Sequence, residues 1–336
     1  MVAQINRGYV FTRPTRLWSR LISYALFEGR PLTTRGRWIN PLIFGHTKAA
    51  RALPQLKEVS APAYVLGTGR SGTTILGIVL SMHKQVGFLN EPKALWAALH
   101  PNEDLIGSYN SNCARYRLTR DDAKFDLIEA AHKVFGSYLA VSNARQLVDK
   151  YPEMIFRTDF VREIFADAKF IFLSRSGVAT CASIENWSKR LGQEMDGETH
   201  DWWGANDRKW NFLVQQIVPE HPDLAIHAEA LSELDHTARA AVEWIVTMRE
   251  GLRLLERDDQ GVLHVPYEHL CADPRGWACK LEEYLGLERD KVFEDYAERT
   301  LSDPAREIML NLPDWLRTIF DETELARAEA AERCAL

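Results

Sequence analysis

Residues 67–74 read Gly67-Thr68-Gly69-Arg70-Ser71-Gly72-Thr73-Thr74, and this glycine-rich stretch decides the fold. An apolar run, Ala63-Tyr64-Val65-Leu66, precedes it, and a helix-like run begins at Ile75. A strand, a glycine-rich loop and a helix in this order form a phosphate-binding loop, because the loop N–H groups and the positive helix end converge on an anion. We therefore expect an anion site at residues 67–74.

The stretch departs from the Walker A pattern, G-x-x-x-x-G-K-[ST], at one position. Gly67, Gly72 and Thr74 match the pattern, but Thr73 stands where the lysine is expected. Arg70 instead supplies a permanently charged, planar group of donors that suits an oxyanion. The loop therefore predicts binding of a phosphate-like anion and argues against a nucleoside triphosphate.

The composition is that of a folded globular protein. The 336 residues are 46% hydrophobic and 26% charged, and the formal net charge of −6 argues against nucleic acid as the main partner. The five cysteines include no C-x-x-C pair, so the sequence indicates neither a structural zinc site nor a disulfide framework. The sequence shows neither a bilayer-spanning apolar run nor a signal-peptide pattern, so we expect a cytoplasmic protein.

Apolar and helical patterns alternate along the rest of the chain. Strands are expected at residues 63–67, 86–91, 169–173 and 262–267, and helices at residues 72–83, 120–149, 156–165, 178–190, 237–257 and 274–286. This alternation predicts an α/β fold with a central parallel sheet flanked by helices. Ligands of such sheets bind beyond the carboxyl ends of the strands, so the loops after Leu66, Leu173 and Val265 should face one crevice.

A second anion site is expected at Arg175, directly after the strand at residues 169–173. A P-loop kinase needs an aspartate near this point to hold Mg²⁺. An arginine repels Mg²⁺ and attracts another phosphate. Two anion sites without a metal-binding carboxylate suggest a nucleotide with phosphates at two positions, and we expect no metal.

Three motifs together resemble those of sulfotransferases that use 3′-phosphoadenosine-5′-phosphosulfate (PAPS). Gly69-Arg70-Ser71-Gly72-Thr73-Thr74 resembles the 5′-phosphosulfate loop of that family. Lys169-Phe170-Ile171-Phe172-Leu173-Ser174-Arg175, followed eight residues later by Ser183, resembles its 3′-phosphate motif. The segment 265–287 resembles a third block, whose tyrosine, here Tyr267, lies near the nucleotide.

The resemblance covers residues 62–290. It implies a P-loop-like sulfotransferase fold, PAPS as the sulfate donor, the bisphosphate PAP as the product, and no metal. The cytosolic members end with an Arg-Lys-Gly motif that also holds the 3′-phosphate, and this chain lacks it. Ser302 and Arg306 are weak substitutes for that motif.

The resemblance also implies catalytic roles. The acceptor hydroxyl needs a general base, and the leaving group needs positive donors. Glu91 resembles the glutamate base of tyrosylprotein and carbohydrate sulfotransferases. Lys150 resembles the family lysine that contacts the bridging oxygen, and Arg70 would share in the stabilisation. The acceptor hydroxyl stays open among sugar, lipid-linked, natural-product and tyrosyl groups.

Four tryptophans between the second and third motifs carry two interpretations. They could line an acceptor cleft, since aromatic faces suit sugars and rings, or they could pack in the core. They are Trp187, Trp202, Trp203 and Trp210.

We divide the chain into a basic N-terminal arm, residues 1–60, and a sulfotransferase domain, residues 61–336. The arm has ten basic and two acidic residues and includes Trp18 and Leu21. Either it packs on the acidic body, or it associates with an anionic membrane surface or a lipid-linked substrate. The sequence predicts no oligomeric state.

Two other functions stay open. One is a P-loop kinase of a small molecule or lipid, which the missing Walker lysine and metal-binding aspartate oppose. The other is a non-catalytic nucleotide-binding protein that keeps the fold.

Overall fold

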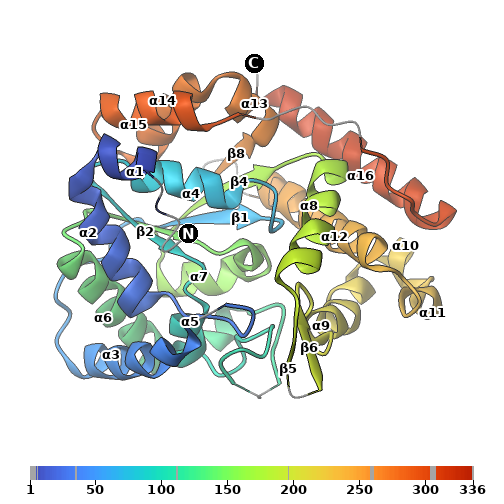
Figure 1. Ribbon diagram of the computed structural model, residues 1–336, viewed down its shortest axis with the longest axis horizontal. Coiled ribbons are helices and arrows are strands. Elements are labelled where there is room, and N and C mark those ends of the chain that lie inside the picture. The colour runs from blue at the N-terminus through green and yellow to red at the C-terminus, as the bar shows by residue number, and fades with distance from the viewer. Residues whose placement is uncertain are drawn as a thin grey trace.

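A parallel sheet carries the loop after β1 (Ala63–Gly67) at its centre. The computed structural model describes residues 5, 7–34, 36–110, 113–195, 197–257, 261–302 and 308–334. Within these residues the sheet has five strands in the order β2-β3-β1-β4-β8, all parallel (Figure 1). The other four strands are β2 (Val86–Asn90), β3 (Gln146–Lys150), β4 (Lys169–Ser174) and β8 (Val262–Pro266). The predicted α/β fold with a parallel sheet flanked by helices is confirmed.

Helices cover both faces of the sheet, as a parallel sheet requires. On one face Val65, Ile171 and Val265 pack against α4 (Thr73–Ser81) and α14 (Pro274–Leu285). On the other face Tyr64, Leu66, Phe170 and Phe172 pack in a core that includes residues of the following helices (Figure 1). They are α6 (Phe125–Val141), α7 (Thr158–Ile164) and α12 (His236–Arg257). The alternation of side chains along each strand thus divides the core into two halves.

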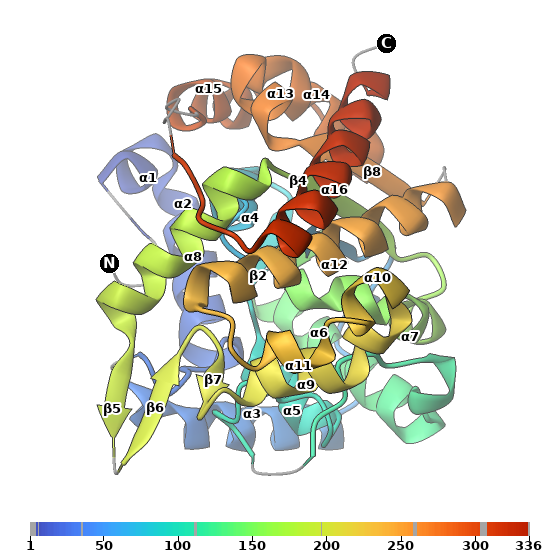
Figure 2. The same ribbon diagram turned by 90° about the vertical axis from the view of Figure 1, so that its right-hand side faces the viewer.

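The remaining elements surround this framework. The other helices are α1 (Arg7–Thr12), α2 (Pro14–Ile22), α3 (Asn40–Ala52), α5 (Lys93–Leu99), α8 (Gly177–Leu191), α9 (Arg208–Gln216), α10 (Pro222–Ala225), α11 (Ala228–Leu231), α13 (Tyr267–Ala272), α15 (Lys291–Thr300) and α16 (Asp314–Arg333). After α8 the chain forms a small antiparallel sheet of β5 (Gln193–Met195), β6 (Glu198–Asp201) and β7 (Gly204–Ala205), visible below α8 in Figure 2. Among the described residues, no helix combines the length and apolar character that crossing a membrane requires.

The prediction of a helix over residues 120–149 is wrong at its C-terminal end. Helix α6 stops at Val141, and Asn143 adopts a left-handed conformation with φ of 49° that ends the helical path. Residues 146–150 form β3, which is buried along its whole length between β1 and β2. Lys150 therefore ends a strand at the carboxyl edge of the sheet.

Arginines fasten the N-terminal helices to the rest of the molecule. Arg13 forms a bidentate ion pair with Asp290, with both N–O distances 2.5 Å. Arg16 donates hydrogen bonds to the carbonyl oxygens of Ser81 and Lys84 at 3.4 and 3.2 Å. Residues 13–16 thus bind the domain through their basic side chains.

Candidate active site at the carboxyl edge of the sheet

The loop between β1 and α4 is closely packed on both sides. Gly67 has φ of 141°, and a Cβ atom there would lie 2.4 Å from the carbonyl oxygen of Leu173 in β4. Gly72 has φ of 106°, and a Cβ atom there would lie 2.3 Å from the ring of Tyr267. Both positions therefore require glycine, because any side chain would strain the backbone and collide with a neighbour.

The loop offers what an oxyanion needs. The first N–H groups of α4 have no acceptor within the helix, and the helix dipole adds positive potential at this end. The hydroxyl of Ser71 donates to the carbonyl oxygen of Thr68 at 2.6 Å and holds the turn closed. In the described part of the chain, the buried Thr68 hydroxyl oxygen has no hydrogen-bond partner. Ser71, Gly72, Thr73 and Thr74 thus form a loop whose geometry suits a phosphate-like group.

Basic side chains gather beside this loop. Arg70 donates from Nε to the hydroxyl oxygen of Ser183 on α8 at 3.2 Å. The Arg175 guanidinium lies 4.3 Å from the ring centre of Tyr267, which itself packs on Gly72. Burial lowers the pKa of Arg70, and the charges of Arg190 and Arg175 lower it further. The structure therefore brings Arg70, Arg175, Ser183 and Tyr267 together around one loop.

Arg190 is a member of this basic group that sequence reasoning missed. It lies seven residues after Ser183 on α8, a spacing that puts both on one face of the helix. The sequence signal that could have identified Arg190 is its helical spacing from Ser183.

Glu91 and Lys150 meet at the ends of neighbouring strands. Asn90 of β2 is paired in register with Lys150 of β3, and the Glu91 N–H donates to the Lys150 carbonyl oxygen at 2.7 Å. The two side chains form a direct ion pair. Lys93 Nζ lies 3.5 Å from the other carboxylate oxygen of Glu91. The predicted base and the predicted lysine are thus in contact.

Two lysines control the ionisation of Glu91. Burial acts to raise its pKa, but the charges of Lys150 and Lys93 outweigh burial and lower the pKa below its usual value. Glu91 is therefore a carboxylate at neutral pH. The Glu91 side chain is 37% exposed to solvent, whereas the Lys150 side chain is only 1% exposed.

A row of alternating charges runs from this pair into the molecule. Lys93 Nζ lies 2.9 Å from Glu153 of the 3₁₀ helix η5 (Pro152–Arg157). Glu153 lies 3.6 Å from Lys209 Nζ of α9, and Lys209 lies 2.5 Å from Glu243 of α12. We call these six residues the ionic row: Lys150, Glu91, Lys93, Glu153, Lys209 and Glu243.

The ionic row ends at the anion loop. Glu243 accepts a hydrogen bond from the Trp202 indole N–H at 2.6 Å. The Trp202 ring lies so close to Gly69 that a Cβ atom there would be 2.4 Å from it. The row therefore connects the Glu91–Lys150 pair with the loop. Sequence reasoning missed its inner members because Glu153, Lys209 and Glu243 stand in distant segments without a shared motif.

Two of the four tryptophans lie beside the loop, and the other two are packed in the core. Trp187 and Trp202 meet edge to face beside the loop, with ring centres 5.5 Å apart. Trp203 and Trp210 are buried and pack against each other in the core, so the acceptor-cleft interpretation is wrong for them. Of the weak 3′-phosphate substitutes, Ser302 accepts a hydrogen bond from Tyr267 at 3.5 Å through its carbonyl oxygen, and Arg306 lies outside the described residues.

A cavity of about 630 Å³ adjoins the β6–β7 hairpin. Its lining includes Tyr109, Arg208 and Phe212. Burial, together with nearby carboxylates that include Glu91, raises the pKa of Tyr109. Tyr109 thus lies within electrostatic range of the predicted base.

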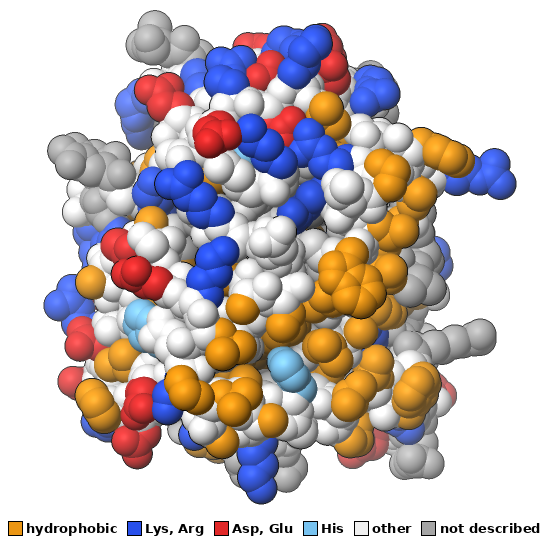
Figure 3. Space-filling model, turned by 90° about the vertical axis from the view of Figure 1, so that its left-hand side faces the viewer, with side chains coloured by type: hydrophobic (Ala, Val, Ile, Leu, Met, Phe, Trp, Pro, Cys, Tyr) orange, Lys and Arg blue, Asp and Glu red, His pale blue; other side chains and the backbone are white. Residues whose placement is uncertain are grey.

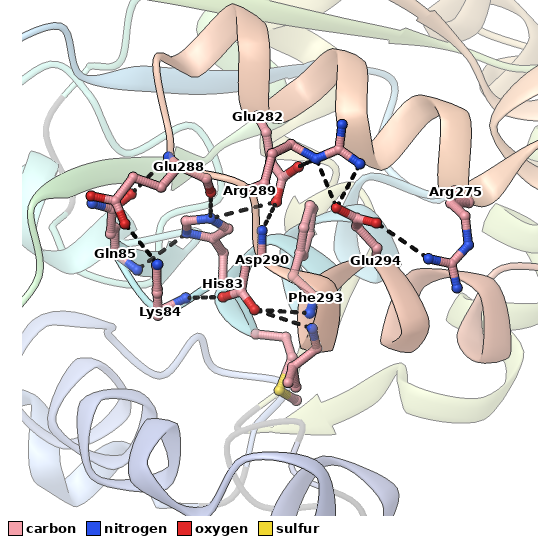
Figure 4. A network of polar contacts seen from close by, with 12 residues as sticks. His83, Lys84, Gln85, Arg275, Glu282, Glu288, Arg289, Asp290, Phe293 and Glu294 are labelled. Carbon is pink, nitrogen blue, oxygen red and sulfur yellow. Dashed lines mark hydrogen bonds and ion pairs between the residues drawn. The ribbon is translucent and has the colours of Figure 1, made fainter.

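Another polar network lies at the opposite end of α4 (Figure 4). Among the described residues, Cys279, Glu282 and Glu294 form the one group of potential ligands close enough to share a metal ion. Arg289 binds both carboxylates, at 3.1 Å from Glu282 and 2.8 Å from Glu294, and Arg275 binds Glu294 at 3.2 Å (Figure 4). These guanidinium groups already balance the carboxylates, so the network joins α14 to α15 as a structural contact.

The ionic row predicts a large stability cost for Glu243→Gln. Glutamine keeps an acceptor for Trp202 but leaves Lys209, which is 3% exposed, short of a negative charge. We expect the free energy of unfolding to fall by about 3 kcal/mol, because buried Lys209 loses the nearer of its two carboxylate partners and keeps only Glu153 at 3.6 Å. Denaturant titration measures this loss.

The matched control is Glu185→Gln, which removes an exposed pair with Lys189 on α8. That change should cost about 0.5 kcal/mol. Equal losses in the two variants would show that the buried row contributes nothing beyond a surface pair.

The fold and the site define a parallel α/β protein with a phosphate-binding loop and a carboxylate–lysine pair at one edge of its sheet. A family model described as "Sulfotransferase family" matches residues 62–224. This range contains the loop, Glu91, Lys150, Arg175 and Ser183. The match spans 163 of the 336 residues, just under half of the chain, and supports a sulfotransferase family.

Other comparisons give more distant similarities. The chain is 26% identical over 129 residues to nodulation protein NoeE of Sinorhizobium fredii, and the match covers 37% of this chain and 30% of that protein. The sulfotransferase domain of the Synechococcus PCC 7002 olefin synthase is 18% identical, with a TM-score of 0.47 over 82% of this chain and 97% of that one. Sulfotransferase STF9 from Mycobacterium avium is 15% identical, with a TM-score of 0.45 over 96% of this chain and 87% of that one.

Proposed function

We propose that this protein transfers a sulfuryl group from PAPS to an acceptor hydroxyl, with Glu91 as the base. One observation carries the proposal: the Glu91–Lys150 ion pair lies at the same sheet edge as the anion loop. In a sulfotransferase, a carboxylate beside a lysine supplies both charges that the reaction needs, one for the acceptor and one for the leaving group.

The residues present fit a donor with two separate phosphate groups. The loop from Gly69 to Thr74 would hold the 5′-phosphosulfate through its N–H groups and the Arg70 side chain. Arg175 and Ser183 would bind the 3′-phosphate. Tyr267 packs against both Gly72 and Arg175 and would position them against the nucleotide.

The chain's own groups account for the movement of charge. When bound, PAPS supplies the sulfuryl group, whose sulfur bonds to the acceptor oxygen while its bond to the phosphate oxygen breaks. Glu91 takes the proton of the acceptor hydroxyl, and its lowered pKa keeps it ionised and ready to do so at neutral pH. Lys150 and Arg70 donate hydrogen bonds to the departing phosphate oxygen and offset its developing charge.

The acceptor stays open. The cavity beside the β6–β7 hairpin falls within the volume range of small-molecule sites, and we propose that it receives the part of the acceptor that does not react. Its lining combines the rings of Tyr109 and Phe212 with the amides of Asn206 and Asn211. Such a lining suits a polar acceptor better than a hydrocarbon one.

The donor assignment predicts weaker product binding in Arg175→Ala. Removing a charge-assisted contact should weaken PAP binding about 10- to 100-fold. Calorimetric titration with PAP measures this affinity. Arg257→Ala is the control, because Arg257 pairs with Asp159 on the surface. Normal PAP affinity in Arg175→Ala would remove Arg175 from the 3′-phosphate site.

The kinase alternative makes the opposite prediction. Tight ATP binding that depends on Mg²⁺ would support a kinase, and the match of residues 62–224 to the sulfotransferase family opposes it. The non-catalytic alternative predicts PAP binding without sulfate transfer. The contact between the Glu91 and Lys150 side chains favours a working catalyst.

A further inference from the structure

Helix α2 buries two arginines and exposes two of its apolar side chains, although Ile22 at its end packs in the core. Arg16, Ser19 and Arg20 are buried, whereas Trp18 is 67% exposed and Leu21 is 37% exposed. A surface helix normally buries its apolar stripe and exposes its charges. The burial of two arginines in α2 therefore needs a physical reason.

The buried arginines fix this orientation. Arg20 forms a buried ion pair with Glu28 at 2.5 Å and donates to the Phe88 carbonyl oxygen at 3.1 Å. Arg16 binds carbonyl oxygens at the end of α4 and beyond it, including that of Val86. Rotating the helix would break these contacts and leave the buried Glu28 carboxylate without its partner, so Trp18 and Leu21 are held facing outward.

Neighbouring segments extend the apolar surface. Phe11 of α1 is 80% exposed, and after α2 the chain exposes Trp38 at 80% and Leu42 at 55%. We call Phe11, Trp18, Leu21, Trp38 and Leu42 the N-terminal apolar face. Figure 3 shows hydrophobic side chains gathered on the side of the molecule that the N-terminal helices form. A gathered surface of this kind marks an interaction site.

The charged residues of segment 7–60 indicate what kind of partner would bind the N-terminal apolar face. Among the described residues from 7 to 60, the exposed basic residues are Arg7, Arg37, Lys48 and Arg51, and the exposed acidic residue is Glu58. The other acid, Glu28, is buried and neutralised by Arg20. Exposed aromatic residues with basic neighbours suit the interface of an anionic membrane, where rings enter the headgroup layer and cations meet lipid phosphates.

We propose that the N-terminal apolar face docks this protein onto an anionic lipid surface. No membrane-spanning segment is needed for such docking, because aromatic burial and lipid electrostatics together provide the affinity. A second copy of this chain is a poorer partner. A two-fold contact would set the basic residues of one copy against those of the other. The proposal does not depend on the sulfotransferase reaction.

Vesicle sedimentation tests this docking. The full chain is mixed with vesicles of phosphatidylcholine alone or of phosphatidylcholine with phosphatidylglycerol, and the bound fraction is measured over a range of salt concentrations. We expect binding to the anionic vesicles that weakens as salt rises. The double change Phe11→Ser, Trp18→Ser should weaken it at least about tenfold.

Two further variants sharpen the test. Lys48→Gln and Arg51→Gln should each weaken binding to anionic vesicles about fivefold. Leu325→Ser, which alters a 62% exposed leucine on α16, should bind like the unaltered chain. All these side chains are exposed, so circular dichroism should show unchanged folding.

Two results would overturn the proposal. One is the absence of sedimentation with anionic vesicles at low salt. The other is a stable dimer in analytical ultracentrifugation that Phe11→Ser, Trp18→Ser dissociates, since the face would then bind a second copy.

Discussion

Glu91→Gln is expected to slow sulfuryl transfer about 10²- to 10⁴-fold, the range for loss of a general base. Glutamine keeps the shape of the side chain and an oxygen for Lys150, but it cannot take the acceptor proton. The anion loop and Arg175 are untouched, so PAP affinity should stay close to that of the unaltered enzyme. The measurement follows labelled sulfate from PAPS into the metabolites of an extract of producing cells, beside a PAP titration.

The control for this variant is Glu288→Gln, which alters an exposed carboxylate paired with Lys84 far from the loop. It should transfer sulfate at the normal rate. If Glu91→Gln also kept normal turnover, Glu91 would have no part in the proton transfer. A parallel loss of PAP affinity would instead point to a disturbed donor site.

Lys150→Met is expected to lower the rate of transfer about 10²- to 10³-fold, because the departing oxygen loses a charged donor. It should also shift the pH profile. Burial acts to raise the pKa of Glu91, and Lys150 is the largest of the opposing influences. Without Lys150 the pKa of Glu91 rises, and its carboxylate is protonated at a higher pH. The acid limb of kcat/KM should therefore move to higher pH.

Lys93→Met separates the two effects of Lys150. Lys93 also lowers the pKa of Glu91, at 3.5 Å, but we assign it no contact with the leaving group. Its loss should move the acid limb in the same direction with a smaller loss of rate at high pH. Equal rate losses in the two lysine variants would contradict the leaving-group role of Lys150. An unmoved acid limb in Lys150→Met would contradict Glu91 as the titrating base.

Most of the fold could be predicted because four of the five strands of the parallel sheet are short, largely apolar runs between loop residues. β1, β2, β4 and β8 all match their predicted spans to within a residue. β3 was not predicted, because only Leu147 and Val148 of its residues are apolar. Its Asp149 is a buried carboxylate, which a sequence pattern does not indicate. Trp96 donates to that carboxylate at 2.8 Å, and burial raises the pKa of Asp149 to about 8. Asp149 can be buried because Trp96 of α5 donates a hydrogen bond to it, and no local sequence pattern predicts that contact.

The candidate site likewise contains residues that could be predicted from the sequence and residues that could not. Residues that act through the backbone of a loop or the end of a strand, such as Gly72 and Arg175, follow from short motifs. Residues that act through a partner far along the chain do not. Lys209 and Glu243 look like ordinary charges on amphipathic helices, and only the folded chain puts them 2.5 Å apart. The roles that we give to Glu91 and Lys150 stay predictions.

The ionic row contains three positive and three negative side chains, so its charges cancel at rest. A proton taken up by Glu91 would remove one negative charge and leave the row with a surplus of one positive charge. That surplus would arise beside Lys150, at the point where the departing phosphate gains its negative charge. In the proposed reaction, the proton of the acceptor would thus increase the attraction for the group that its oxygen displaces, and deprotonation and departure would favour each other electrostatically.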